Sequence, residues 1–372
     1  MSRRRSAILF LSIVTSRLSW AEKTPRDLLQ EAVTFQQQGR FQDAINDYKI
    51  LLQRFPNLAE VRSNLGAALA ANGQYEDAIQ EYKRALAAKP NIEVQTNLAI
   101  AYYKSGELPL AEKEFQSVLK GRPADLRSVK LLADCLLQEG DNKKVIELLD
   151  PLATANPGDQ AISYLLGAAL VRDNQAARGQ VFIDRIFHAG DSAEARVLMG
   201  ATKMQVNDFA GAREDLQKAV ELSPGLADAN AYYGLALMST GDTSGGRDYF
   251  RKALALDPNS YLANLRLGVL LRQDQEYEEA ARYLQHALRV RPGDLAARFQ
   301  IASVLLSTDK TTDALAQFES IVKESPSFSE AHVALATLYY RLKRKADADR
   351  ERALVEKLTA AQQATQPGVA AR

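Results

Sequence analysis

The 372-residue chain has little of what catalytic, metal-binding and disulfide-rich proteins need. It has one cysteine, Cys135, so an intramolecular disulfide is impossible. Its three histidines (His188, His286 and His332) have no second His, Cys or acidic residue at metal-ligand spacing on the same helical face. A phosphate-binding glycine loop and a zinc-protease motif are also missing. We therefore expect no catalytic residues, no cofactor and no metal, and we predict that the protein is not an enzyme.

The chain also lacks an excess of either charge and a long apolar run. It has 47 Lys and Arg residues against 46 Asp and Glu residues. A protein with a general nucleic-acid surface would show a basic excess, so we expect no nucleic-acid partner. A membrane-spanning helix needs ~20 consecutive apolar residues, and no stretch supplies them. We expect no integral membrane segment in the mature chain.

Residues 1–21 have the layout of a secretory signal peptide. A basic start at Arg3–Arg5 precedes the apolar run Ala7–Val14, and small residues flank a cleavage point after Ala21. This order predicts export, to a periplasm or out of the cell. The stretch is also rich in Arg and Ser and has no acidic residue, which is typical of a mitochondrial transit peptide. A mitochondrial or, without cleavage, a cytoplasmic location is therefore the alternative.

Proline recurs along the chain at a fixed interval. Successive gaps are 34, 33, 34, 67, 34, 34 and 34 residues, and the gap of 67 spans two periods, with Asp191 where a proline is missing. Such a period indicates a solenoid of helical hairpins, which needs no single large core. The prolines are Pro56, Pro90, Pro123, Pro157, Pro224, Pro258, Pro292 and Pro326.

One period, Tyr261–Asp294, shows what each repeat contains. Its first half carries apolar residues at helical spacings, and its second half does so at a four-then-three rhythm. The polar stretch Gln273–Glu276 separates the halves and predicts a turn. Pro292 ends the second half, because proline cannot continue a helix. Gly268 and Ala280 are small where the two helices must cross closely.

Ten repeats align in this way, and three positions carry the pattern. The eighth residue is always small: Ala32, Gly66, Ala99, Ala133, Gly167, Gly200, Gly234, Gly268, Ala302 and Ala336. The twentieth is small in nine repeats: Ala44, Ala78, Ala111, Gly179, Ala212, Gly246, Ala280, Ala314 and Ala348. The twenty-fourth is large and apolar or aromatic in nine repeats: Tyr48, Tyr82, Phe115, Leu149, Ile183, Leu216, Phe250, Leu284 and Phe318.

This pattern resembles the tetratricopeptide repeat family. The resemblance implies an all-α, right-handed superhelical solenoid of about ten helical hairpins over residues 22–358, followed by a flexible tail at 359–372. The repeats are expected to begin near residues 25, 59, 92, 126, 160, 193, 227, 261, 295 and 329. Repeat five is the irregular one, because Gly179 lies in its second helix; a hinge and ordinary sequence drift both remain open.

The resemblance implies a non-catalytic scaffold that binds a protein or peptide partner in its concave groove. First helices line that groove in the family, and the positions that meet ligands there carry over to Asn64, Asn97, Tyr103, Lys104, Arg127, Lys130, Tyr164, Arg172, Met204, Tyr232, Met238, Arg266, Arg272, Phe299 and Tyr340. Some of these side chains could instead seal the joints between repeats.

Two features bear on the kind of partner. Asn64 and Asn97 occupy equivalent places in adjacent repeats and resemble asparagines that grip a peptide backbone in some relatives. The family's chaperone-tail clamp also needs a lysine four residues earlier, where this chain has Glu60 and Glu93. That departure argues against a chaperone partner. An accessory subunit of an envelope assembly, secretion or polysaccharide-export machine is the alternative function.

Overall fold

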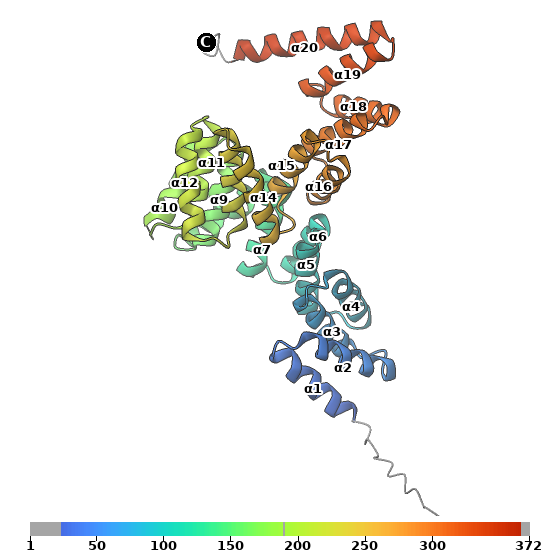
Figure 1. Ribbon diagram of the computed structural model, residues 1–372. Helices are drawn as coiled ribbons and strands as arrows, with labels where there is room; N and C mark the ends of the chain where they lie inside the picture. The colour runs from blue at the N-terminus through green and yellow to red at the C-terminus, as the bar shows by residue number, and fades with distance from the viewer. Residues whose placement is uncertain (1–23, 189, 366–372) are drawn as a thin grey trace, which may run out of the picture. The chain divides into compact units, whose positions relative to one another are not determined.

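The computed structural model of the chain describes residues 24–188 and 190–365, with side chains to residue 361. Within these ranges the chain forms twenty α-helices and no strand, as the sequence pattern predicts (Figure 1). The expected signal peptide at residues 1–21 and the last seven residues of the expected tail lie outside the described ranges.

The helices alternate as first and second members of ten hairpins in the described chain. The first helices are α1 (Pro25–Gln37), α3 (Ala59–Ala71), α5 (Ile92–Ser105), α7 (Leu126–Glu139), α9 (Gln160–Arg172), α11 (Ala193–Gln205), α13 (Ala227–Ser239), α15 (Tyr261–Gln273), α17 (Leu295–Ser307) and α19 (Ser329–Arg341). The second helices are α2 (Phe41–Arg54), α4 (Tyr75–Ala88), α6 (Leu108–Gly121), α8 (Asn142–Ala155), α10 (Ala176–His188), α12 (Phe209–Leu222), α14 (Thr243–Leu256), α16 (Tyr277–Val290), α18 (Thr311–Glu324) and α20 (Lys345–Thr365).

The chain divides into two compact units, and each is described by itself. The first ends at Pro90 and contains α1–α4, which are repeats one and two. The second begins at Asn91 and contains α5–α20, which are repeats three to ten. All cavities discussed below belong to the second unit.

Small residues at position eight receive the large side chain at position twenty-four of the same repeat. A Cβ added to Gly268 would lie 2.7 Å from Leu284 Cγ, and one added to Gly66 would lie 2.7 Å from Tyr82 Cε1. Carbon atoms in ordinary contact are ~3.5–4.0 Å apart, so these positions exclude any larger residue. The large side chains at position twenty-four, such as Phe250, are fully buried. This contact packs the two helices of the hairpin together in repeats two, six, seven and eight, whereas Gly167 of repeat five faces Leu198 and Phe182 instead.

The fifteenth residue of every repeat has a positive φ. It is Gly39, Gly73, Gly106, Gly140, Asn174, Asn207, Gly241, Gln275, Asp309 or Lys343, with φ between 58° and 94°. This left-handed conformation ends the first helix and starts the turn. Glycine and asparagine adopt it readily, whereas a longer side chain costs roughly 1–2 kcal/mol there. Gln275 and Lys343 therefore hold strained backbone within regular turns.

Two local features refine the expectations from sequence. Gly179 does not leave a gap in α10, because a Cβ there would lie 2.9 Å from Val171 Cγ2, so its small size serves helix crossing. The last helix α20 continues to Thr365, beyond the expected boundary at residue 358. Residues 359–365 are mainly Ala and Gln, which favour helix, and Pro367 follows them.

Candidate functional site

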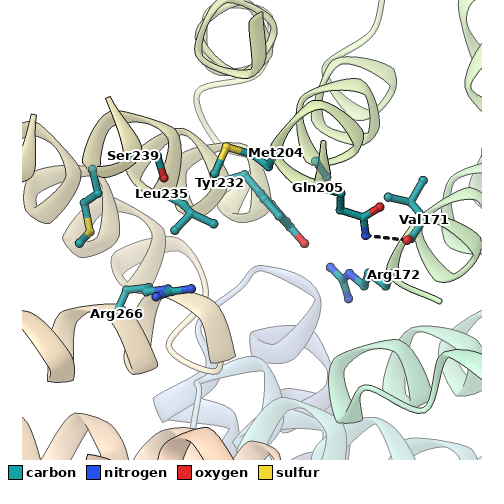
Figure 2. A pocket seen from close by; sticks show the side chains of 10 residues that line it. Val171, Arg172, Met204, Gln205, Tyr232, Leu235, Ser239 and Arg266 are labelled. Atoms are coloured by element: carbon teal, nitrogen blue, oxygen red, sulfur yellow. Dashed lines mark hydrogen bonds between the residues drawn. The ribbon is translucent and has the colours of Figure 1, made fainter. Parts of the chain in front are cut away.

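A cavity of about 460 Å³ lies among the first helices of repeats five to eight; we call it the inner cavity (Figure 2). Five residues that the sequence assigns to the ligand face line it: Arg172, Met204, Tyr232, Met238 and Arg266. They come from α9, α11, α13 and α15, so four consecutive repeats each contribute. Val171, Ala201, Gln205, Leu235 and Ser239 complete the lining.

Arg172 holds one side of the inner cavity. Its guanidinium donates to the Leu137 carbonyl at 3.1 Å and lies 6.0 Å from the centre of the Tyr232 ring. Burial lowers the pKa of Arg172, but the oxygens of Tyr232 and Asp228 outweigh that effect and raise the pKa above its ordinary value. The residue is therefore a permanent cation beside an apolar space.

A second cavity of about 410 Å³ shares Arg172, Tyr232 and Leu235 with the first; we call it the acidic cavity. Asp134, Asp228 and Asp257 line it. Burial raises the pKa of Asp134 and of Asp257, and the charge of Asp228 raises both further. Desolvation disfavours the charged carboxylate, which is why these groups hold protons more tightly than in water.

Two sequence-predicted tyrosines hydrogen-bond to two of the three aspartates of the acidic cavity. The Tyr103 hydroxyl donates to Asp134 at 2.5 Å and accepts from the side-chain amide of Gln138 at 2.5 Å. The Tyr164 hydroxyl donates to Asp228 at 3.0 Å. Both hydroxyls are thus already paired within the fold. Their expected contact with a ligand would require them to exchange these partners.

Hydrogen bonds between repeats that are not neighbours lie at the edge of the acidic cavity. We call this set of hydrogen bonds the seam. The Asn259 amide donates to the Lys104 carbonyl at 3.0 Å, and Arg291 Nε donates to the Gln138 carbonyl at 2.5 Å. Both carbonyls lie in the last turn of a first helix, where backbone oxygens have no partner within the helix. The seam joins repeats three and four to repeats seven and eight.

His286 supports the seam from α16. Its Nε2 lies 3.0 Å from Asn259 Oδ1, and its Nδ1 lies 2.6 Å from a guanidinium nitrogen of Arg289. Because arginine can only donate, Nδ1 accepts and Nε2 carries the proton. Burial, and then the charge of Arg289, lower the pKa of His286. The neutral ring therefore donates to Asn259 while that side chain donates onward to Lys104.

Three predicted site residues make packing or pairing contacts away from both cavities. Lys130 pairs with Asp159 at 3.0 Å. Arg272 donates to the side chain of Gln300 at 3.2 Å. The Phe299 ring lies 5.5 Å from the ring of Phe318 and 5.7 Å from that of Phe328, and it packs against the core of the last two repeats.

The remaining predicted residues line neither the inner cavity nor the acidic cavity. Asn64 belongs to the first compact unit and Asn97 to the second, and both are partly buried on their helices. Lys104 is exposed, with its ammonium 5.4 Å from the centre of the Tyr103 ring, and Arg127 is exposed at the start of α7. Tyr340 is 62% exposed on α19.

Sequence reasoning missed the residues that make the seam. Asn259 and Arg291 flank the repeat-ending prolines Pro258 and Pro292, positions that the family pattern leaves without a ligand role. Their partners are backbone carbonyls from the repeat four positions earlier. A local sequence period does not predict such hydrogen bonds, because the pairing depends on how far the stack of repeats curves.

The groups that could carry other chemistry are held inside the fold. The Cys135 thiol is buried and donates to the Leu108 carbonyl at 3.3 Å, and burial raises its pKa. A raised pKa leaves little of the nucleophilic thiolate. His332 is buried between Glu351 and the Pro326 carbonyl. Within the described ranges, no three His, Cys, Asp or Glu side chains are grouped as a metal site.

Comparison with known proteins agrees with this architecture. Two family models, both described as tetratricopeptide repeat, match residues 29–91, 102–169, 197–261, 235–295, 265–327 and 299–364. These matches cover most of the chain, which therefore belongs to the tetratricopeptide repeat family. Its repeats indicate a protein–protein interaction scaffold.

Solved structures support the fold and leave the partner open. A chain in the crystal structure of the APC/C hetero-tetramer Cut9-Hcn1 aligns with a TM-score of 0.61 and 16% identity, over 91% of this chain and 81% of that one. At that identity the likeness concerns the fold alone. A search of curated proteins finds no match. Among the described helices, none combines the length and the apolar character needed to cross a bilayer.

Proposed function

We propose that the inner cavity binds an extended segment of a protein partner, and that this binding is the activity of the scaffold. The observation that supports it is the gathering of five predicted ligand-facing residues from four successive repeats around one space. Preformed helices lose little conformational entropy when a ligand binds, so modest contacts add up. Aromatic residues such as Tyr232 act as anchors in such interfaces and are worth ~2 kcal/mol or more each.

Site-directed photo-crosslinking in the native host tests this proposal. A benzophenone amino acid replaces Met204 or Met238 in the inner cavity, or Leu222 on the outer surface of α12 as the control, which is 50% exposed. We expect the same crosslinked protein from both inner positions and none from the control. A partner that crosslinks only to the outer position would place binding on the convex side and refute the proposal.

The captured partner then allows an affinity measurement. Tyr232→Ala should weaken its binding at least roughly tenfold, which is the loss of ~1.4 kcal/mol. Circular dichroism of the variant should match the parent, because Tyr232 is only partly buried. Equal affinity of the variant and the parent would show that the partner does not use the inner cavity.

Export is a separate proposal that rests on residues 1–21. The basic, apolar and small-residue order at this end predicts cleavage after Ala21, leaving Glu22 as the first residue. Mass spectrometry of the protein purified from its native host measures the new terminus. A terminus at Ser2 in the cytosolic fraction would contradict export.

A further inference from the structure

The inner cavity contains two cations and no carboxylate. Arg172 and Arg266 both line it, while its other side chains are apolar or neutral. Figure 2 shows the two guanidinium groups directed toward the space beside the Tyr232 ring. Arg172 donates to the Leu137 carbonyl and lies close enough to Asp228 for that charge to raise its pKa. Among the described residues Arg266 forms no ion pair, and its Nε is buried without a hydrogen-bond partner. A buried donor without a partner costs free energy, which a ligand oxygen would recover.

The rest of the lining is suited to an apolar side chain. Met204, Leu235 and Met238 surround the arginines together with the Tyr232 ring. Methionine is unbranched and adapts its shape to different partners. The same space therefore offers a carboxylate two strong donors and offers a neighbouring apolar group a flexible surface.

The neighbouring acidic cavity disfavours a ligand anion on its side of Arg172. Asp228 lies on that side of Arg172, and its carboxylate already accepts from the Tyr164 hydroxyl. A second anion there would meet three aspartates, whereas on the Arg266 side it would meet none. Charge complementarity therefore favours an anion between the two arginines and disfavours one on the far side of Arg172.

We propose that the partner segment carries an Asp or Glu side chain next to a large apolar residue. The carboxylate accepts from Arg172 and Arg266, and the apolar residue packs on Met204 and Met238. This inference rests on the proposed function, because it assigns the chemistry of the segment that the inner cavity binds. It differs from the chaperone-tail clamp that the sequence argues against, since it uses repeats five and eight.

A random peptide library displayed on phage, selected against the whole protein, tests the inference without a known partner. We expect selected peptides to share an acidic residue beside Leu, Ile, Met or Phe. Synthetic copies, amidated so that they lack a terminal carboxylate, should bind Arg266→Glu at least roughly tenfold more weakly. Arg266→Gln should weaken binding less. A selection on Arg266→Glu should favour Lys or Arg at the same place.

Arg282→Glu is the matched control. It makes the same change of charge in the same repeat, on the exposed surface of α16 beside a separate cavity of about 820 Å³, and should leave the selected peptides and their affinities unchanged. Circular dichroism and unfolding of all variants check that the repeats remain folded. Equal losses for Arg282→Glu and Arg266→Glu would mean a general charge effect and would overturn the assignment.

The other outcomes separate the two proposals. Peptides that lose affinity with Tyr232→Ala, but lack an acidic residue and bind Arg266→Glu as well as the parent, would overturn this inference while supporting the inner cavity as the binding site. Selected peptides that bind Tyr232→Ala as tightly as the parent would overturn both proposals. A selection that yields no binding peptide would also count against both.

Discussion

Repeats three to eight and repeats nine and ten use the same hairpin in two ways. In the former, Asn259 and Arg291 bond to carbonyls of distant repeats, and the inner cavity and the acidic cavity remain, both lined in part by charged side chains. In the latter, Phe299 lies between Phe318 and Phe328 and fills the joint between neighbours. An aromatic residue at a ligand-facing position thus seals a joint in one region, while Tyr232 leaves a cavity in the other.

The largest expected effect on stability comes from two buried phenylalanines, and it tests whether loosening one repeat affects only its neighbours or also distant repeats. Phe250 and Phe318 are the buried position-twenty-four residues of repeats seven and nine, so Phe250→Ala and Phe318→Ala should each cost roughly 3–5 kcal/mol. Repeat arrays couple mainly through neighbours. Hydrogen exchange should therefore quicken only in α17–α20 for Phe318→Ala, but also in the last turns of α5 and α7 for Phe250→Ala.

The faster exchange expected in α5 and α7 for Phe250→Ala depends on the seam alone. The loop of Asn259 follows α14, which contains Phe250, so loosening that helix releases the bond to Lys104 in α5. Loosening that spreads to the adjacent repeat eight releases the bond from Arg291 to Gln138 in α7. If α5 and α7 exchange equally slowly in both variants, the seam does not couple distant repeats in solution.

The seam itself is tested by a pair of glycine substitutions. Gly106 and Gly241 both have positive φ, at 82° and 94°. A Cβ added to Gly106 would lie 2.7 Å from Asn259 Oδ1. A Cβ added to Gly241 would have no such neighbour within 4 Å. Gly241→Ala should cost only the backbone strain of roughly 1–2 kcal/mol. Gly106→Ala should cost ~1 kcal/mol more in denaturant unfolding, because it displaces a hydrogen-bonded side chain.

A double-mutant cycle sharpens that result. In an Asn259→Ala background the Cβ of Gly106→Ala no longer meets an amide, so its extra cost should disappear, leaving only the strain seen for Gly241→Ala. Additive costs would instead indicate that residues 106 and 259 do not touch.

The fold was predictable from the sequence to a large extent, whereas the site was predictable only in part. Position-eight and position-twenty-four residues such as Gly268 and Leu284 interact within one hairpin, so a local pattern predicts their contact. Arg172 and Arg266 are brought together by three successive repeat-to-repeat packings, and the family pattern located both. Asn259 could not be predicted, because its partner carbonyl depends on the accumulated curvature of several repeats.

Ionisable groups in the two regions should respond to pH in opposite directions. Burial, and then the nearby Glu112, raise the pKa of Glu139 to about 7, whereas hydrogen bonding to Arg344 lowers the pKa of Asp347. Glu139 binds its proton more tightly when folded, so its contribution to stability declines as pH rises from its unfolded pKa through about 7. Asp347 contributes stability above its unfolded pKa, and this is lost as pH falls through its lower folded pKa.

Glu139→Gln isolates the first of these contributions. The neutral amide removes the charge that burial disfavours, so the variant should be more stable than the parent by ~1–2 kcal/mol at pH 8 and by little at pH 5. Urea unfolding at both pH values measures the difference. Glu76→Gln, on the exposed surface of α4, is the control and should show no such pH dependence. A gain for Glu139→Gln that is equal at both pH values would contradict the raised pKa.

The smallest effect concerns the turn of repeat eight, where a glutamine stands in the conformation that glycine takes in repeat seven. Gln275 has φ of 67°, and its side chain is exposed. Gln275→Gly removes the left-handed strain of roughly 1–2 kcal/mol but increases the entropy of the unfolded chain, so we expect a net gain of roughly 0.5–1 kcal/mol. Gln285→Gly, exposed within α16, should lose ~1 kcal/mol, because glycine is a poor helix former there. Opposite signs for the same substitution ten residues apart would show that the turn strain is real in solution, whereas a loss in both variants would exclude the positive φ at Gln275.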